Sequence, residues 1–142
     1  YYLANFLGLP IESAITAAHL VFGGVLDRFP NLKICLSHAG GVLPFMVGRL
    51  EHGQSVRPEA QDRCRHPFSY YLKNFYVDTI TFRSDTLRFV LELMPPGHVF
   101  LGTDYPYDMA DTDPVGSVKN ALRDKAQRPA ILGGNLAAVF GL

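Results

Sequence analysis

The feature that most constrains the fold of this sequence is an alternation of helix-like segments with short apolar runs, each run ending in polar or glycine-rich residues. Apolar residues three or four positions apart, at Ile15, Ala18 and Phe22, predict an amphipathic helix. Its start is expected near Glu12 and its exit at Pro30. Alternation of this kind is typical of parallel strands that are joined by crossover helices.

Three apolar runs predict strands that are buried on both faces, as in a parallel sheet. They are Leu32–Ser37, Phe75–Ile80 and His98–Gly102. A short helix at Phe45–Leu50 follows the first run and precedes a polar stretch through Arg65, which is expected to form a long loop.

The later helices carry their own start signals. Ser84 is expected to cap one helix, Asp113 and Pro114 to open another, and Asn135 to cap the last. The core side of the helix after Ser84 is predicted to carry Leu87, Val90, Leu91 and Met94.

Three strands with their helices form an incomplete object, because a complete (β/α)₈ barrel takes about 250 residues. The sequence therefore predicts an α/β fold in a single domain over residues 1–142, either a partial TIM-like (β/α) barrel or a small open three-layer sheet. In both architectures, polar residues just beyond the carboxyl ends of strands are where chemistry is placed.

Composition excludes several classes of protein. The chain is 48% hydrophobic and 18% charged, which is typical of a globular domain, and its formal net charge of +0 predicts neither a nucleic-acid nor a membrane partner. We expect no bilayer-spanning segment, because no apolar run was found to reach about 18 residues. Cys35 is expected to be buried and Cys64 to lie in a polar connection, which does not suggest disulfides and favours the cytoplasm.

His38 and Asp104 are the first candidates for chemistry. Each follows a predicted strand, so both are expected at the carboxyl end of one parallel sheet. A histidine there can move protons near neutral pH, and a carboxylate can hold a divalent cation. Position alone leaves a helix cap or turn as an equal alternative.

Arg49 is the third candidate. Its guanidinium suits a substrate carboxylate, but spacing alone favours a surface salt bridge to Glu51.

Several runs resemble the amidohydrolase-related decarboxylases, and in particular the aminocarboxymuconate-semialdehyde decarboxylase-like group. The runs are residues 29–41, Pro44–Arg49, Leu101–Tyr107 and Ile131–Asn135. The resemblance implies that the chain corresponds to about the last four β/α units of a barrel, that is, to its C-terminal half.

The resemblance also implies roles for the three candidates. His38 would be the acid/base residue, Arg49 would hold a substrate carboxylate, and Asp104 would bind the metal, which is expected to be zinc. The family also uses a His-X-His pair and a further histidine, and these remaining ligands are absent here. His19 does not replace them, because it lies within a predicted helix.

Three functions remain open from the sequence. The first is a metal-dependent decarboxylase of a small unsaturated or aromatic carboxylic acid. The second is a metal-dependent hydrolase of a lactone or amide, and the third is a catalytically inert fragment or assembly module. Open sheet edges would allow a homo-oligomer.

Overall fold

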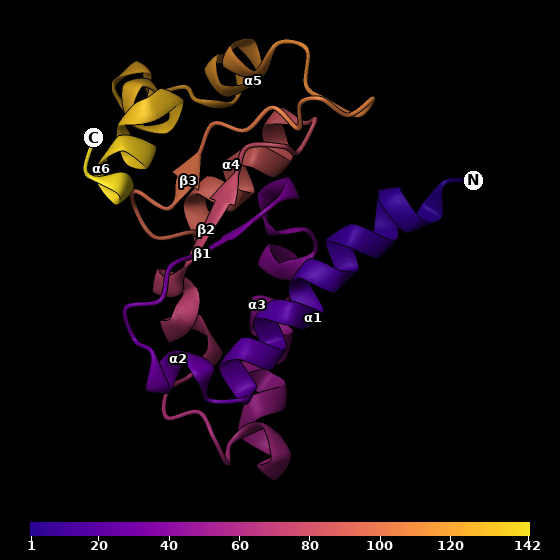
Figure 1. Ribbon diagram of the computed structural model, residues 1–142, viewed down its shortest axis with the longest axis vertical. Helices are drawn as coiled ribbons and strands as arrows, with labels where there is room; N and C mark the ends of the chain where they lie inside the picture. Colours follow the sequence, from indigo (N-terminus) through magenta and orange to yellow (C-terminus); the bar gives the residue numbers. More distant parts are fainter.

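The computed structural model describes residues 1–142, which form an α/β structure around one three-stranded parallel sheet in the order β1-β2-β3 (Figure 1). The strands are β1 (Ile34–Leu36), β2 (Phe75–Asp78) and β3 (Val99–Phe100). The predicted parallel α/β arrangement is confirmed. The strands are shorter than predicted, because the chain turns away from the sheet before the polar loops that follow them.

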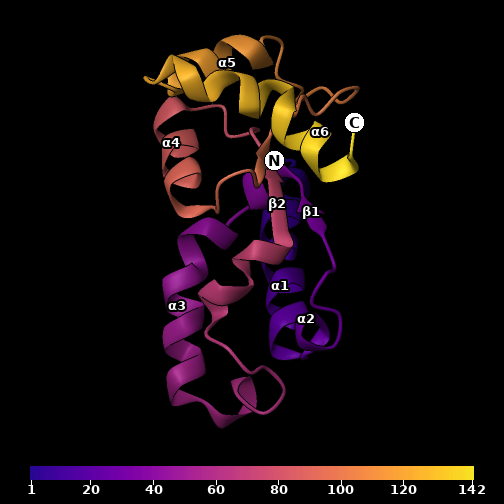
Figure 2. The ribbon, with the colours of Figure 1, turned by 90° about the vertical axis from the view of Figure 1, so that its left-hand side faces the viewer.

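Six α-helices surround this sheet, with shorter helical turns between them. They are α1 (Leu9–Phe22), α2 (Val25–Arg28), α3 (Leu43–Val56), α4 (Ser84–Leu93), α5 (Pro114–Ala121) and α6 (Asn135–Phe140). Helices α5 and α6 lie together at the β3 end of the molecule, whereas α1, α2 and α3 gather at the other end (Figures 1 and 2).

The first helix begins earlier than predicted. A π-helical turn at Ala4–Gly8 runs directly into α1, and Pro10 fits its first turn, where no N–H donor is needed. The continuous segment Ala4–Phe22 has 19 residues and includes an 18-residue window with a mean hydropathy of 1.2, so by length and composition it could cross a membrane. This corrects the expectation that no such segment exists. Its buried residues pack in the protein core, as a core helix also would: Ala14, Ala17 and Val21.

Helix α3 corrects a second prediction, because it continues to Val56 instead of ending near Leu50. The extension is fixed by tertiary hydrogen bonds. The amide nitrogen of Gln54 donates to the carbonyl oxygen of His66 at 2.8 Å and contacts the sulfur of Cys64 at 3.1 Å. The polar stretch is thus folded against the helix, and the Cys64 side chain is buried within it.

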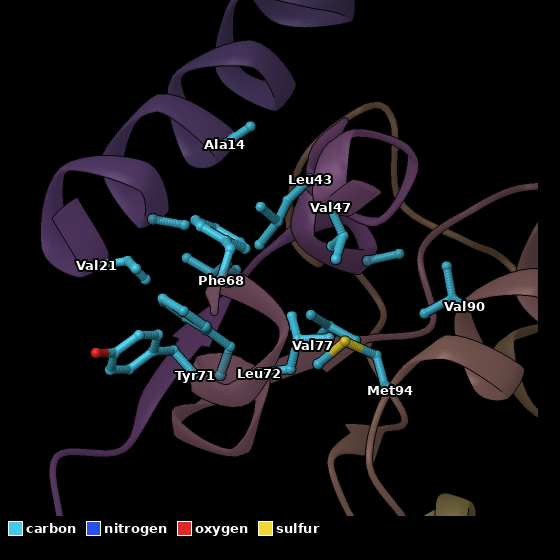
Figure 3. Close-up of a cluster of buried hydrophobic side chains, with 14 of the residues drawn as sticks. Ala14, Val21, Leu43, Val47, Phe68, Tyr71, Leu72, Val77, Val90 and Met94 are labelled. Atoms are coloured by element: carbon cyan, nitrogen blue, oxygen red, sulfur yellow. The ribbon is translucent and has the colours of Figure 1, made fainter. Parts of the chain in front are cut away.

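The main core fills the space between one face of the sheet and helices α1, α3 and α4 (Figure 3). Phe68 and Phe75 are completely buried there. Val90 and Met94 of the α4 segment join this core, whereas Leu87 belongs to a second, smaller cluster with Val118 of α5. The predicted core side of α4 is confirmed, with Leu91 partly buried between the two clusters.

The opposite face of the sheet is only partly covered. Tyr76 stacks on His98 and Phe100, with ring centroids 4.2 and 5.3 Å apart. Cys35, which pairs with Tyr76 in register and so shares this face, is exposed. The prediction of a buried Cys35 is wrong, because β1 is an edge strand whose second face lacks a packed layer at this position.

Two of the three predicted caps are also corrected. Asp113 does cap α5, accepting a hydrogen bond from the backbone N–H of Gly116 at 3.0 Å. Ser84 is instead the first residue of α4 and caps nothing through its side chain. Asn135 is the first residue of α6, and its amide nitrogen donates to the carbonyl oxygen of Val99 at 2.9 Å. That bond fastens α6 to β3.

Candidate active site

His38 is positioned by a tight turn that directly follows β1. The backbone φ angles of His38 and Ala39 are 55° and 54°, in the left-handed region that residues other than glycine rarely adopt. Gly40 and Gly41 continue the turn with φ angles of 80° and 62°. The turn therefore reverses the chain within a few residues and leaves the imidazole at the carboxyl end of the sheet.

Asp104 follows β3 in the same way, again with a left-handed φ of 58°. Its Oδ1 lies 3.7 Å from Nε2 of His38, and the two side chains are 18% and 27% exposed. The predicted meeting of His38 and Asp104 is confirmed. A separation of 3.7 Å is too long for a hydrogen bond, so the two groups are neighbours that are not bonded to each other.

Both side chains keep free hydrogen-bonding capacity. Nδ1 of His38 is buried and has no partner. The contact with His38 is the sole ion-pair contact of the Asp104 carboxylate. Unpaired polar groups of this kind are costly in a folded protein and mark places where a ligand, ion or water completes the structure.

The two residues lie at one cavity of about 620 Å³, a size that suits a small molecule. Four phenylalanines from separate segments line it: Phe6, Phe45, Phe82 and Phe89. No lysine or arginine is among the lining residues. The cavity is therefore apolar and aromatic apart from a few polar groups, among them His38, Asp104 and Asp85.

Asp85 lies on the cavity wall at the start of α4 and carries a compensating partner. Arg83 donates two hydrogen bonds to its carboxylate, at 2.6 and 3.0 Å. These bonds, together with one from the Thr86 backbone N–H, lower the pKa of Asp85 to about 2. Asp85 is thus charged at neutral pH, and Arg83 balances that charge from outside the cavity lining.

Arg49 is not brought to His38 and Asp104 within this chain. It is exposed on α3 and is not among the cavity-lining residues. The alternative salt bridge to Glu51 is not formed either, because the Glu51 carboxylate accepts the backbone N–H of Ser69 at 3.0 Å. The Ser69 side chain and its backbone N–H together lower the pKa of Glu51. The role of Arg49 in binding a substrate carboxylate stays a prediction.

The structure holds no group of three or more His, Cys, Asp or Glu side chains that could together bind a metal ion. Asp104 alone offers one carboxylate with free lone pairs, next to the unpaired imidazole of His38. Such a carboxylate fits one ligand position of a divalent cation, whereas zinc sites in proteins usually take at least three protein ligands.

Two residues of the site were not predicted from the sequence, Phe6 and Asp78. The Ala4–Gly8 turn supplies Phe6 to the cavity, although it is distant from His38 in the chain, and nothing local in the sequence signals that contact. The second is Asp78, whose carboxylate accepts hydrogen bonds from the backbone N–H groups of His38 and Ala39. Its place at the end of the second predicted strand, on the same rim as His38 and Asp104, was the available signal.

A small-molecule cavity at the carboxyl ends of parallel strands, with an imidazole and a carboxylate facing each other, defines the class of α/β proteins with strand-end active sites. The chain belongs to the amidohydrolase family, whose model matches residues 1–142.

Relatives within that family include decarboxylases. The chain is 36% identical to 2-amino-3-carboxymuconate-6-semialdehyde decarboxylase of Dictyostelium discoideum, over 100% of this chain and 40% of that protein. It is 33% identical to gamma-resorcylate decarboxylase of Rhodococcus jostii, over 92% of this chain and 40% of that protein. The resemblance to amidohydrolase-related decarboxylases is thereby confirmed, and the chain spans about two fifths of the length of these relatives.

Solved structures of decarboxylases resemble this chain over most of its length. The 5-carboxyvanillate decarboxylase LigW of Sphingomonas paucimobilis is 30% identical with a TM-score of 0.81, over 94% of this chain and 41% of that chain. A dihydroxybenzoic acid decarboxylase of Polaromonas, solved with bound manganese and the inhibitor 2-nitroresorcinol, is 28% identical with a TM-score of 0.82, over 94% and 41%.

Proposed function

We propose that this chain forms part of a metal-dependent decarboxylase that acts on a small aromatic or unsaturated carboxylic acid. The single observation that carries the proposal is the facing pair of His38 and Asp104 at an apolar cavity lined by four phenylalanines. Aromatic side chains of this kind bind a planar ring by stacking or edge contacts. The names of its relatives, which are decarboxylases, support the same chemistry.

His38 would act as the proton donor. When the bond between the ring carbon and the carboxylate breaks, carbon dioxide leaves and the bonding electron pair stays on the carbon. The protonated imidazole then delivers its proton to that carbon, a transfer that typically contributes about 10²- to 10⁴-fold to the rate. Because Nδ1 is buried, Nε2, which lies beside Asp104, is the nitrogen that would face the substrate.

Asp104 would provide one ligand to a divalent cation, which when bound polarises the substrate and neutralises its negative charge. The remaining ligands would come from outside these 142 residues. Zinc is the cation expected from the sequence resemblance, whereas the Polaromonas neighbour contains manganese, so both are candidates here.

Arg49 would orient the substrate from the rim of the cavity. It follows the cavity-lining Phe45 by four residues, so the two side chains share one face of α3. Helical side chains lean toward the helix N-terminus, which brings the guanidinium toward the phenylalanine. Since no cation lines the cavity itself, this arginine is a suitable counter-charge for a substrate carboxylate.

The three strands would be consecutive strands of a TIM-like barrel that other residues complete, with residues 1–142 as one partial domain. Both β1 and β3 are edge strands here, and completion of a barrel would pair them. The placement in the C-terminal half of such a barrel, a homo-oligomeric state and a cytoplasmic location stay predictions.

The test uses the full-length natural protein, purified and loaded in parallel with manganese or zinc. We expect carbon dioxide release from 2,6-dihydroxybenzoate or from 2-amino-3-carboxymuconate-6-semialdehyde. Hydrolysis of a lactone or amide without release of carbon dioxide would instead favour the hydrolase alternative. A full-length protein that binds neither metal and turns over neither kind of substrate would favour an inert assembly module.

A further inference from the structure

We propose that Asp78 is a positioning residue, which aims the His38 imidazole at Asp104 by holding the backbone of His38 and Ala39 in its left-handed conformation. The inference rests on the proposed function for its catalytic consequence. Its structural part stands on contacts in this chain alone.

The carboxylate of Asp78 accepts three backbone N–H groups. Its Oδ2 accepts the N–H of His38 at 2.8 Å, and its Oδ1 accepts the N–H of Ala39 at 2.7 Å. The same Oδ1 also accepts the N–H of Ile80 at 2.9 Å, which anchors the carboxylate to its own strand end. Hydrogen bonds from backbone N–H groups to an ionised carboxylate are stronger than neutral ones.

The two residues whose backbone Asp78 binds have conformations that need stabilisation. His38 and Ala39 both have left-handed φ angles, and neither is a glycine. Such conformations persist only where the surrounding structure over-determines them, and they cluster at functional sites. If the turn relaxed toward ordinary φ angles, the imidazole would swing away from its position 3.7 Å from Asp104.

Gly102, which lies just beyond the end of β3, supports this arrangement. A Cβ atom at Gly102 would lie 2.6 Å from the Cβ of Asp78, so only glycine allows β3 to approach the carboxylate this closely. The Gly102 N–H donates to Oγ1 of Thr79 at 3.2 Å, which fixes the two strand ends together. The turn after β1, the end of β2 and the segment leading from β3 to Asp104 are therefore coupled through Asp78.

Asp78 acts through the backbone and does not touch the cavity, because it is not among the lining residues. This separates it from His38 and Asp104, which face the open space. A positioning role of this kind predicts a loss in kcat rather than in KM, since substrate contacts remain while the proton donor is misplaced.

The first test is Asp78→Asn in the full-length protein. Asparagine keeps one acceptor oxygen and presents an NH2 donor in place of the other, at nearly unchanged volume, so it cannot accept all three backbone N–H groups. We expect kcat to fall by about 10- to 100-fold, as for a catalytic group displaced by about 1 Å, with KM changed by less than about threefold. Hydrogen exchange at the backbone amides of residues 38 and 39 should accelerate at least about tenfold.

The matched control is Asp27→Asn. Asp27 also accepts a backbone N–H, from Arg65 at 2.9 Å, and the Tyr71 hydroxyl at 2.7 Å, but it lies outside the cavity. This control should lower thermal stability without a selective loss in kcat and without faster exchange at residues 38 and 39.

Two further substitutions, at Gly102 and Ala39, distinguish positioning of His38 from general destabilisation. Gly102→Ala should reproduce the loss in kcat, and the double variant Asp78→Asn/Gly102→Ala should be no worse than about twofold below the poorer single variant, because both act through one carboxylate. Ala39→Gly in the Asp78→Asn background should recover at least about threefold of the lost kcat, since glycine adopts a left-handed φ without help.

The results that would overturn the positioning role of Asp78 differ from those that would overturn the proposed decarboxylase function. Wild-type amides at residues 38 and 39 that exchange as fast as free loop amides would overturn the positioning role, whatever the enzyme catalyses. So would faster exchange in Asp78→Asn with an unchanged kcat, or additive losses in the double variant. A wild-type protein without decarboxylase activity would reject the proposed function, and hydrogen exchange would still decide the positioning.

Discussion

Nε2 of His38 and Oδ1 of Asp104 lie 3.7 Å apart, although the two residues follow different strands and are distant along the chain. The separation exceeds a hydrogen bond, and no other charged side chain neutralises the Asp104 carboxylate in this structure. The two groups are therefore placed to act on a ligand beside them in the cavity.

Replacing His38 should remove the proposed proton donor while leaving the fold intact. We expect His38→Asn in the full-length protein to lower kcat for decarboxylation by about 10²- to 10⁴-fold, with a small change in melting temperature. His52→Asn is the control, because His52 is exposed on α3 and does not line the cavity. Equal activity of the two variants in a carbon dioxide release assay would remove His38 from the mechanism.

Replacing Asp104 should weaken metal binding. Asp104→Asn removes one anionic ligand, so we expect the metal content of the purified full-length protein to fall clearly below that of the wild type. Elemental analysis after dialysis measures this without reference to activity. Asp108→Asn, in the same loop but outside the cavity, should keep the wild-type content. Retention of full metal content by Asp104→Asn would contradict its role as a ligand.

Removing Arg83 should expose the charge of Asp85 at the cavity wall. We expect Arg83→Gln to raise KM for a carboxylate substrate by about two- to threefold at low salt, and less at high salt, because the uncompensated carboxylate repels the anion. An unchanged KM at low salt would show that the charge of Asp85 does not repel the substrate.

Arg83→Gln should also change how the stability of the protein depends on pH. The folded pKa of Asp85 is about 2, below its ordinary value of 3.8, so the pair contributes stability above about pH 4 that is lost as the pH falls through 2. Arg83→Gln should therefore lower stability near neutral pH slightly and converge with the wild type in strong acid. Thermal unfolding between pH 2 and 7 measures the difference, and a gap that widens toward acid would have the wrong sign.

Substitution of Phe68 should lower stability, whereas substitution of Phe45 should weaken substrate binding. Phe68 is fully buried in the main core, so Phe68→Ala should cost about 3–5 kcal/mol of unfolding free energy. Phe45 is 82% exposed and lines the cavity, so Phe45→Ala should change stability little and raise KM. Denaturant unfolding and steady-state kinetics measure the two effects. A destabilised Phe45→Ala with normal KM would argue against the aromatic wall as a binding surface.

The reactivity of the Cys35 thiol should show whether other residues of the full-length protein cover this face of the sheet. Cys35 is exposed in this chain, on the face shared with Tyr76. If a barrel closes over that face, Cys35 in the full-length Cys64→Ser protein should react with a thiol reagent at least about tenfold more slowly than after unfolding. Labelling at the unfolded rate in the native full-length protein would mean that the face stays open.

The sequence alone determined the parallel α/β arrangement and the convergence of His38 with Asp104. Both follow from local rules, because a continuous apolar run favours a doubly covered strand and parallel strands end at one edge. The Asp113 cap was equally predictable, since its bond to Gly116 spans three residues.

Tertiary structure decided the features whose partners lie far along the chain. Helix α3 extends past Leu50 because Gln54 binds the segment around Cys64 and His66, and Asn135 fastens α6 to β3 instead of capping its own helix. Cys35 is exposed and Cys64 buried because burial depends on which layers cover a face, which periodicity does not reveal. The place of Asp78 at the end of a predicted strand indicated the same rim as His38, but only the tertiary structure brought its carboxylate to the backbone N–H groups of His38 and Ala39.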